Sequence, residues 1–261
     1  MTRPVSARFA LALIVSFVVV LCLIPCNAIA GPARQACVPY IGEQLNFAVG
    51  WEFINAGSAT MNIRAKAEGG YQIHTFARTN KFFDMFKKVR DTIVSEGLCR
   101  QGKMQSTVFD IEQHENKYHA KKQARFLWRK NQVTYTQHDH TDVYDVPAGH
   151  LNVLDAFLTV RNITLVKGQT VKVPIFDSRK TYEIHVNVLG KEQLRAPWGD
   201  FVDCLVIEPK LMTEGIFSSK GKVKLWLTDD ERHIPLKMTA KIKFGRIIAR
   251  LQQYHANAAR P

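Results

Sequence analysis

The sequence predicts a mainly β protein: a curved antiparallel sheet or open β-barrel of about a dozen strands with two short helices. Apolar and polar residues alternate along most of residues 42–254, which is typical of strands with one buried face. The connections between these runs are short and often contain Gly, Asn or Asp, so neighbouring strands should pair as hairpins. Residues 80–89 and 150–161 instead carry apolar side chains at helical spacing.

The clearest alternation lies in residues 222–253, which should form three antiparallel strands. A polar turn follows the first strand, Pro235 opens the second, and Gly245 ends it. The residues on one side of the second strand are apolar: Met238, Ala240, Ile242 and Phe244. Those on the other side are mostly cationic: Lys237, Thr239, Lys241 and Lys243. This part of the sheet should therefore have one apolar and one cationic face.

The same period of two predicts the rest of the sheet. These strands are residues 45–53, 59–65, 71–77, 92–96, 104–113, 117–128, 132–136, 170–176, 181–189, 192–195 and 201–209. No linker or internal repeat divides residues 42–254, so we expect a single β-rich domain there. Residues 31–41 and 255–261 should be N-terminal and C-terminal tails.

The two helical segments differ in character. Residues 150–161 place Leu151, Leu154 and Leu158 along one side, so this helix should pack against the concave side of the sheet. Residues 80–89 should form a shorter helix that Asn80 can cap.

Large apolar residues in two connecting segments form a candidate rim for binding a ligand or facing a membrane. They are Phe82, Phe83, Met85, Phe86, Met212, Ile216 and Phe217. Connections usually run over the surface, and Lys81, Lys87 and Lys88 flank the first group, as an interfacial segment requires. Alternatively, these residues fold inward and close the core.

Residues 1–30 are typical of a secretory signal. Arg3 and Arg8 precede an apolar run, and Ala28 and Ala30 stand where a signal peptidase reads small residues. We therefore expect cleavage after Ala30 and a periplasmic protein. The alternatives are an uncleaved anchor helix and a lipoprotein acylated on Cys26, although a proline directly before that cysteine fits a lipoprotein signal poorly.

The charge of the chain suggests a class of partner. Residues 31–261 carry a formal charge of +11, because the +13 of the whole chain includes Arg3 and Arg8. An exported protein with this charge meets anionic lipid head groups rather than nucleic acid, so an anionic membrane surface is a candidate partner. The alternative is a basic surface without a specific partner.

Three cysteines remain after the expected cleavage: Cys37, Cys99 and Cys204. Export permits one disulfide and leaves one cysteine over. We favour a Cys37–Cys99 disulfide, because Cys37 lies in the tail and Cys99 ends a strand. The spacing excludes a Cys-x-x-Cys metal or redox pair.

The sequence predicts no catalytic residues, no metal site and no cofactor. His138, His140 and Asp142 could share one face of a strand, but the sequence places no further ligand, so a solvated polar loop is the favoured interpretation. Residues 110–114 combine two carboxylates with a histidine but lack a nucleophile, which favours a solvated strand face. Phosphate-binding loops, dinucleotide fingerprints and a Gly-x-Ser-x-Gly motif are absent from the sequence.

Several short motifs together are similar to those of one family. They are Gly42-Glu43-Gln44-Leu45, Gly50-Trp51, Ala56-Gly57, Asp155-Ala156-Phe157 with Arg161, and residues 225–230 with Arg232, Pro235 and Phe244-Gly245. Over residues 42–251 the chain resembles the domain-of-unknown-function 3108 family of exported bacterial proteins. The resemblance implies a β-rich envelope protein and brings no catalytic residues. The layout also looks like the curved half-barrels of LolA-type and LolB-type lipoprotein carriers.

Export, apolar connections and cationic strand faces together favour one function. We expect a non-enzymatic periplasmic protein that binds or shuttles a lipid or a lipidated partner in a curved β cavity. The first alternative is an envelope scaffold that binds a protein partner through its sheet edge. The second alternative is an uncharacterised envelope hydrolase.

Overall fold

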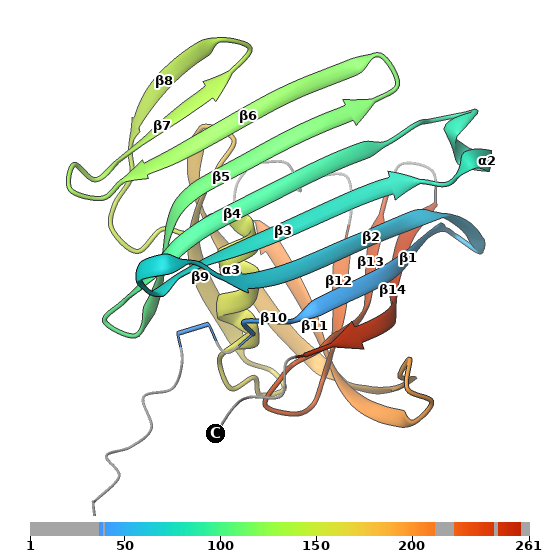
Figure 1. Cartoon of the computed structure of the whole chain (residues 1–261). Helices are drawn as coiled ribbons and strands as arrows, with labels where there is room; N and C mark the ends of the chain where they lie inside the picture. The colour runs from blue at the N-terminus through green and yellow to red at the C-terminus, as the bar shows by residue number, and fades with distance from the viewer. Residues whose placement is uncertain (1–36, 39, 212–221, 243–244, 257–261) are drawn as a thin grey trace, which may run out of the picture. The chain divides into compact units, whose positions relative to one another are not determined.

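The computed structural model describes residues 37–38, 40–211, 222–242 and 245–256. Within these residues, fourteen strands form one antiparallel sheet (Figure 1). The strands are β1 (Gln44–Trp51), β2 (Ile54–Ala65), β3 (Gly70–Thr79), β4 (Arg90–Arg100), β5 (Lys103–Glu115), β6 (Tyr118–Leu127), β7 (Gln132–Gln137), β8 (His140–Asp145), β9 (Thr170–Asp177), β10 (Lys180–Arg195), β11 (Phe201–Leu211), β12 (Val223–Thr228), β13 (Pro235–Lys241) and β14 (Arg246–His255). The prediction of a mainly β, antiparallel fold is confirmed.

Two meanders make up the sheet. Strands β1 to β8 pair in order, strands β9 to β14 pair in order, and β1 pairs with β14 to join the two runs. Strands β8 and β9 are the two edges, so the described sheet is curved but not closed into a barrel. Figure 1 shows the first meander as one wall and the second as a wall behind it, with helix α3 (Val153–Arg161) between them.

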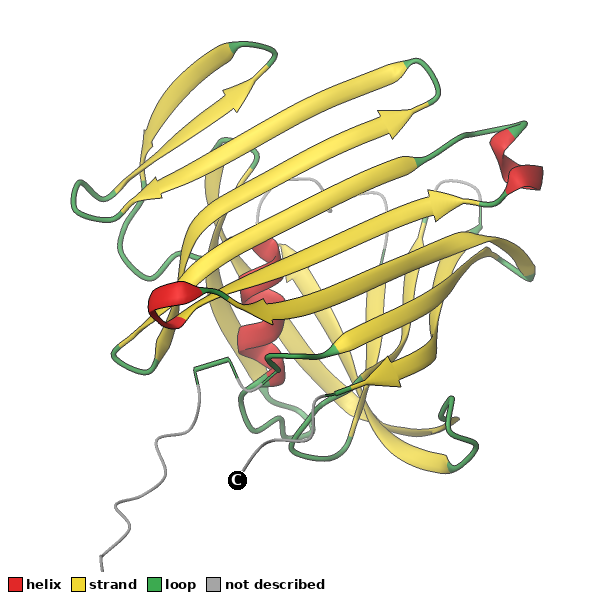
Figure 2. Cartoon of the chain, viewed as in Figure 1, coloured by secondary structure: helices red, strands yellow, loops and turns green. Residues whose placement is uncertain are grey.

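Helix α3 connects the two meanders and fills one part of the concave side. Asn152 caps its start by accepting hydrogen bonds from the backbone N–H groups of Leu154 and Asp155. Ala156 and Val160 pack into the largest core cluster, together with inward residues of β9 to β12. Figure 2 shows how little other helix the described chain contains: α2 (Lys81–Asp84) and one 3-10 turn (Ala67–Gly69).

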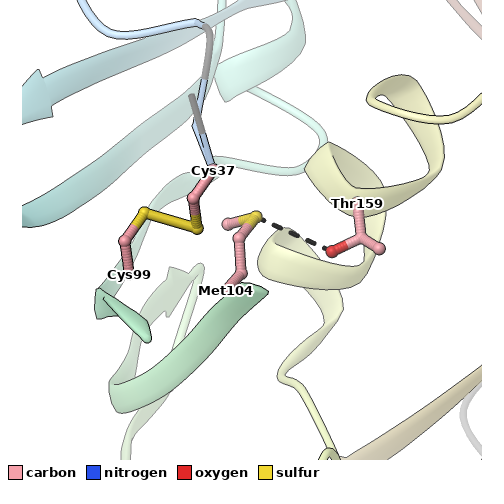
Figure 3. Close-up of a disulfide and its surroundings, with 4 residues drawn as sticks. All are labelled: Cys37, Cys99, Met104 and Thr159. Atoms are coloured by element: carbon pink, nitrogen blue, oxygen red, sulfur yellow. Dashed lines mark hydrogen bonds between the residues drawn. A yellow bond between two sulfur atoms is a disulfide. The ribbon is translucent and has the colours of Figure 1, made fainter. Parts of the chain in front are cut away.

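A disulfide ties the start of the domain to the sheet. Cys37 and Cys99, the latter near the end of β4, are bonded with their Cα atoms 5.8 Å apart (Figure 3). Beside them, the hydroxyl of Thr159 in α3 donates a hydrogen bond to the sulfur of Met104, 3.6 Å away. This end of the molecule is closed by a buried cluster of Cys37, Val38, Tyr40, Ile63, Tyr71, Ile73 and Leu158. The remaining described cysteine, Cys204, is a buried free thiol.

Two strands differ from the sequence prediction. Residues 138–142 were interpreted as a polar loop, but residues 140–145 form the edge strand β8. The sequence shows no strand signal there, because an edge strand with polar residues on both faces has no period of two. Residues 181–189 and 192–195 were expected as two strands but belong to the single strand β10. A β-bulge between Val188 and Gly190 interrupts the alternation there, so the sequence pattern shows a break that the backbone does not have.

Helix α2 is also shorter than the predicted segment 80–89. Asn80 caps it as expected, by accepting a hydrogen bond from the backbone N–H of Phe83 at 2.9 Å. The chain then leaves the helix because its next residues bond to the β5–β6 turn. The backbone N–H of Lys88 donates to Oδ1 of Asn116 at 2.7 Å, and Val89 bridges to Glu115.

Several sequence predictions fall outside the described residues. The expected signal segment, with cleavage after Ala30 and the alternative acylation of Cys26, is one of them. Met212, Ile216 and Phe217 of the candidate rim are the others. In the part of the chain that the structure describes, no helix is both long and apolar enough to cross a membrane.

Candidate functional site

An apolar cavity of about 340 Å³ lies between the two walls of the sheet and helix α3. Residues from both meanders and from the helix line it, including Phe47, Ala59, Met61, Thr75, Val153, Leu154, Phe157, Val160, Val173, Ile184, Val186, Ile207, Val223, Leu225, Met238 and Ala249. Among the described residues of this lining, Lys237 alone is ionisable. Met238 keeps 40% of its surface exposed although it lines the cavity, so the cavity is open to solvent.

Small side chains on the inner faces of β2 and β3 create this space. Ala59 lies opposite Ala77 in the register of the two strands, and Met61 lies opposite Thr75. These positions point inward because side chains alternate between the two faces of a strand. The inward side chains of β9 to β13 and of α3 therefore face only small side chains at Ala59 and Thr75, and a cavity remains there.

A buried polar network holds α3 against the sheet. The carboxylate of Asp155 accepts hydrogen bonds from Ser95 Oγ at 2.7 Å, from Ser106 Oγ, and from Asn152 Nδ2 at 2.9 Å. All four residues are buried. Because Ser95 lies in β4 and Ser106 in β5, the polar side of the helix is fixed to the first meander. The apolar side chains of Val153 and Phe157 are left to face the cavity.

The Asp155 network predicts a specific pH dependence of stability. Burial raises the pKa of the Asp155 carboxyl from 3.8 to about 6, against the lowering effect of its hydrogen bonds to the two serines and Asn152. Since the folded protein holds this proton more tightly than the unfolded chain, the contribution is full below about pH 4 and is lost as pH rises through 6. Relative to Asp155→Asn, the wild type should lose about 2–3 kcal/mol of unfolding free energy between pH 4 and 7. Urea unfolding of both proteins at each pH measures this loss. If the unfolding free energies of the two proteins change in parallel with pH, the prediction is wrong.

A buried ion pair joins the other end of α3 to the chain that enters β1. The guanidinium of Arg161 donates to both carboxylate oxygens of Glu43, at 2.9 and 3.1 Å. Its Nε donates to the backbone carbonyl of His233 at 3.0 Å, and its carbon atom Cζ lies 3.9 Å from the centre of the Tyr40 ring. Tyr254 donates its hydroxyl to Glu43 at 2.8 Å. Helix α3 is thus anchored to the start and the end of the domain.

The α2 segment carries an exposed aromatic group. Phe82 is 57% exposed, Phe86 is 69% exposed and Met85 is 72% exposed, whereas Phe83 is half-buried. The rings of Phe82 and Phe86 lie edge to face, with their centres 5.5 Å apart. The structure therefore places three of the sequence-predicted rim residues on the surface, next to the exposed side chains of Lys81, Lys87 and Lys88.

Neighbouring turns extend this apolar surface. Asn80 donates hydrogen bonds to the backbone carbonyls of Asn55 and Ala56, which hold α2 beside the β1–β2 turn. On the other side, Lys87 pairs with Glu115 at 2.6 Å, which holds α2 beside the β5–β6 turn. We call the exposed apolar residues of these three segments the rim: Phe53, Ile54, Phe82, Met85, Phe86 and Tyr118.

The rim contains residues that sequence analysis did not single out. Phe53 is 96% exposed, yet the alternation assigned it to the end of a strand. Its position beside a turn could have indicated exposure, because an apolar side chain in a turn has few core residues to pack against. The cavity-lining residues of α3 were interpreted as ordinary core, because their spacing is the same in both cases.

The acidic and histidine clusters weighed from sequence stay solvated surface groups. His140 Nε2 lies 2.8 Å from Asp142 Oδ1 in the edge strand β8, and the rings of His114 and His119 are 5.0 Å apart. Within the residues that the structure describes, no group of three or more His, Cys, Asp or Glu side chains is arranged to hold a metal ion.

Comparison with known proteins identifies the family. The family described as "Protein of unknown function (DUF3108)" matches residues 46–252. The chain belongs to this family. A search of curated proteins finds no match. The DUF3108 assignment confirms the resemblance found in the sequence, and it assigns neither an activity nor a ligand.

One solved structure shares the fold of this DUF3108 protein, and two others are similar to it at lower scores. A beta-barrel-like protein of domain of unknown function DUF1849 from Brucella abortus has a TM-score of 0.59 and 9% identity, with 84% of this chain and 99% of that chain covered. The hypothetical protein CT021 from Chlamydia trachomatis has a TM-score of 0.35 and 9% identity, with 85% and 91% covered. A Bacteroides fragilis protein, named as a candidate exported protein with a YmcC-like fold, has a TM-score of 0.32 and 10% identity, with 82% and 96% covered. The first likeness concerns the fold alone, and the other two carry no argument.

Proposed function

We propose that this DUF3108 protein is a non-enzymatic protein of the periplasm that binds or carries a lipid, or the lipid part of a lipidated partner, in the apolar cavity. The observation that carries the proposal is the cavity itself. Its volume of about 340 Å³ is within the range of small-molecule sites, and its walls are almost wholly apolar. An acyl chain is the ligand that such walls favour, because it needs no polar partner.

The energetics of acyl burial agree with reversible carriage. Each buried methylene favours binding by about 0.8 kcal/mol, so roughly ten methylenes would contribute on the order of 8 kcal/mol. After the entropic cost of ordering the chain, this corresponds to micromolar or weaker affinity. Such a ligand can be taken up and released, as a carrier requires.

The position of the cavity along β2 supports uptake through the rim. Ile54 at the start of the strand belongs to the rim, Ala59 and Met61 line the cavity, and Ile63 lies in the buried cluster that closes the far end. Figure 1 shows α2 at the end of the wall that is distant from α3. We propose that the rim faces an anionic membrane, and that its lysines favour this contact.

Native mass spectrometry of the protein purified from its own cell envelope tests the proposal. A bound lipid that disappears on delipidation and returns on incubation with envelope extract is the expected result. Repeated recovery of lipid-free protein that also fails to displace a fluorescent fatty acid would overturn it. Crosslinking in cells distinguishes the lipid carrier from the alternative, an envelope scaffold, because a scaffold should yield one dominant protein adduct.

Filling the cavity should abolish lipid binding without unfolding the protein. We expect Ala59→Phe to weaken binding of a fluorescent fatty acid by tenfold or more, because the ring would occupy space that the acyl chain needs. The matched control is Ser58→Phe, which adds the same ring on the opposite face of β2. Equal affinity in both variants would show that the fatty acid does not bind in this cavity.

A further inference from the structure

A second hollow of about 410 Å³ lies on the opposite face of β12 to β14. Met238 and Ala249 line the apolar cavity, whereas their chain neighbours Thr239, Ile248 and Arg250 line this hollow, as the alternation of side chains requires. We call it the cationic cleft. Its charged lining residues are Lys222, Lys224, Lys237, Lys241, Arg246 and Arg250. Among its described lining residues there is no Asp or Glu.

The charges of the cationic cleft are mostly unneutralised. Arg246 pairs with Glu52 at 3.5 Å. Within the described part of the chain, Lys224, Lys237, Lys241 and Arg250 have no carboxylate within 4.0 Å. Some cations elsewhere on the sheet surface do have such a partner, as Arg125 does with Asp110. The cleft therefore concentrates positive charge that the described residues mostly do not neutralise.

The strand register places like charges directly opposite one another. Lys237 faces Arg250 across β13 and β14, and Lys241 faces Arg246. Such pairs destabilise a sheet, whereas opposite charges in these positions stabilise it. The first meander uses the stabilising arrangement, with Glu112 opposite Lys121. Two repulsive pairs in one cleft are a cost in stability that an anionic ligand would remove.

Lys237 is held in place rather than extended into solvent. Its ammonium nitrogen lies 4.1 Å from the centre of the Trp226 ring, which is 6% exposed and is fixed by a hydrogen bond from its Nε1 to Glu192 at 2.7 Å. Burial, with smaller effects from Arg250 and Arg246, lowers the pKa of Lys237. A neighbouring negative charge would raise the pKa of Lys237 again, so an anion beside Lys237 would stabilise its charged form.

We propose that the cationic cleft binds phosphate groups, one between the side chains of each like-charged pair. Opposed side chains start about 5 Å apart, which lets two cations contact one phosphate. A phosphate monoester carries nearly two negative charges, and the arginine fork binds it through two parallel hydrogen bonds. The pairs are separated by four residues of β13, or about 13 Å, so the cleft suits a ligand with two separated phosphates. Such phosphates belong either to lipid head groups or to a soluble ligand.

The test variant is Lys241→Gln with Arg250→Gln, which removes one cation from each pair and leaves Lys237 in place. The control is Arg129→Gln with Lys130→Gln, which removes the same charges from the β6–β7 turn. Calorimetry with inorganic phosphate tests a soluble ligand, because each like-charged pair should bind one phosphate. Flotation with phosphatidic acid vesicles, compared with phosphatidylglycerol vesicles of equal surface charge, tests a head group.

The wild type should bind inorganic phosphate, or prefer phosphatidic acid over phosphatidylglycerol. The test variant should bind the same ligand at least about tenfold more weakly. Its melting temperature should be unchanged or higher, because a repulsion is removed. The proposal would be overturned if the wild type bound in neither the calorimetry nor the flotation experiment. It would also be overturned if the test variant bound as tightly as the wild type, or if the control variant lost as much affinity as the test variant. Fatty-acid binding should stay unchanged in the test variant, so the proposal for the cleft and the proposal for the cavity are tested independently.

Discussion

Replacing Arg161 with Met should cost about 3–5 kcal/mol of unfolding free energy, which is a large part of the stability of a typical domain. The loss arises mainly because Glu43 is left as a buried carboxylate without its bidentate partner. The backbone carbonyls of Arg232 and His233 lose a donor at the same time. Urea unfolding monitored by tryptophan fluorescence, with the same slope for both proteins, measures the effect.

The double variant Arg161→Met with Glu43→Leu separates the charge from the packing. A buried ion pair replaced by apolar residues of similar volume is often close to neutral, so the double variant should regain much of the lost stability. Glu43→Gln alone should be strongly destabilising, because Arg161 is fully buried and would keep its charge. A single Arg161→Met variant that loses less than about 1 kcal/mol would contradict the anchoring role of the pair.

The sequence predicts the sheet well where each strand has one apolar face. In β13 the alternation assigned Met238 and Lys237 to opposite faces, and these faces border the cavity and the cationic cleft. The prediction fails where the alternation is absent or interrupted. Strand β8 has polar residues on both faces, so its apolar residues show no alternation, and the bulge in β10 shifts the pattern by one residue.

The cavity could not be predicted, because its volume depends on residues that meet across the two meanders. Ala59 and Val186 line the same space, although more than a hundred residues separate them in the chain. The Glu43–Arg161 pair spans 118 residues in the same way. Local patterns identify which side chains point inward, but not how much space remains between opposing inward faces. The exposed residues of α2 were easier to predict than the cavity, because side chains in a short surface connection have few core residues to pack against.

Replacing Phe82, Met85 and Phe86 together with Ser should abolish binding to anionic vesicles and leave folding almost unchanged. The three side chains are 57%, 72% and 69% exposed, so their removal should shift the melting temperature by only a few degrees. Inserted into a bilayer, each would contribute on the order of 1.5–3 kcal/mol, so binding should fall by a hundredfold or more. Vesicle flotation beside a thermal melt measures both quantities.

The control variant is Val143→Ser with Val166→Ser and Phe201→Ser, which removes three apolar side chains of similar exposure outside the rim. It should float with vesicles as the wild type does. A further variant, Lys81→Gln with Lys88→Gln, should weaken binding to anionic vesicles while binding to neutral vesicles stays the same, because each lysine contributes about 1 kcal/mol near an anionic surface. An unfolded rim variant would mean that these residues stabilise the core. A folded rim variant that floats like the control would show that the protein does not meet membranes through this end.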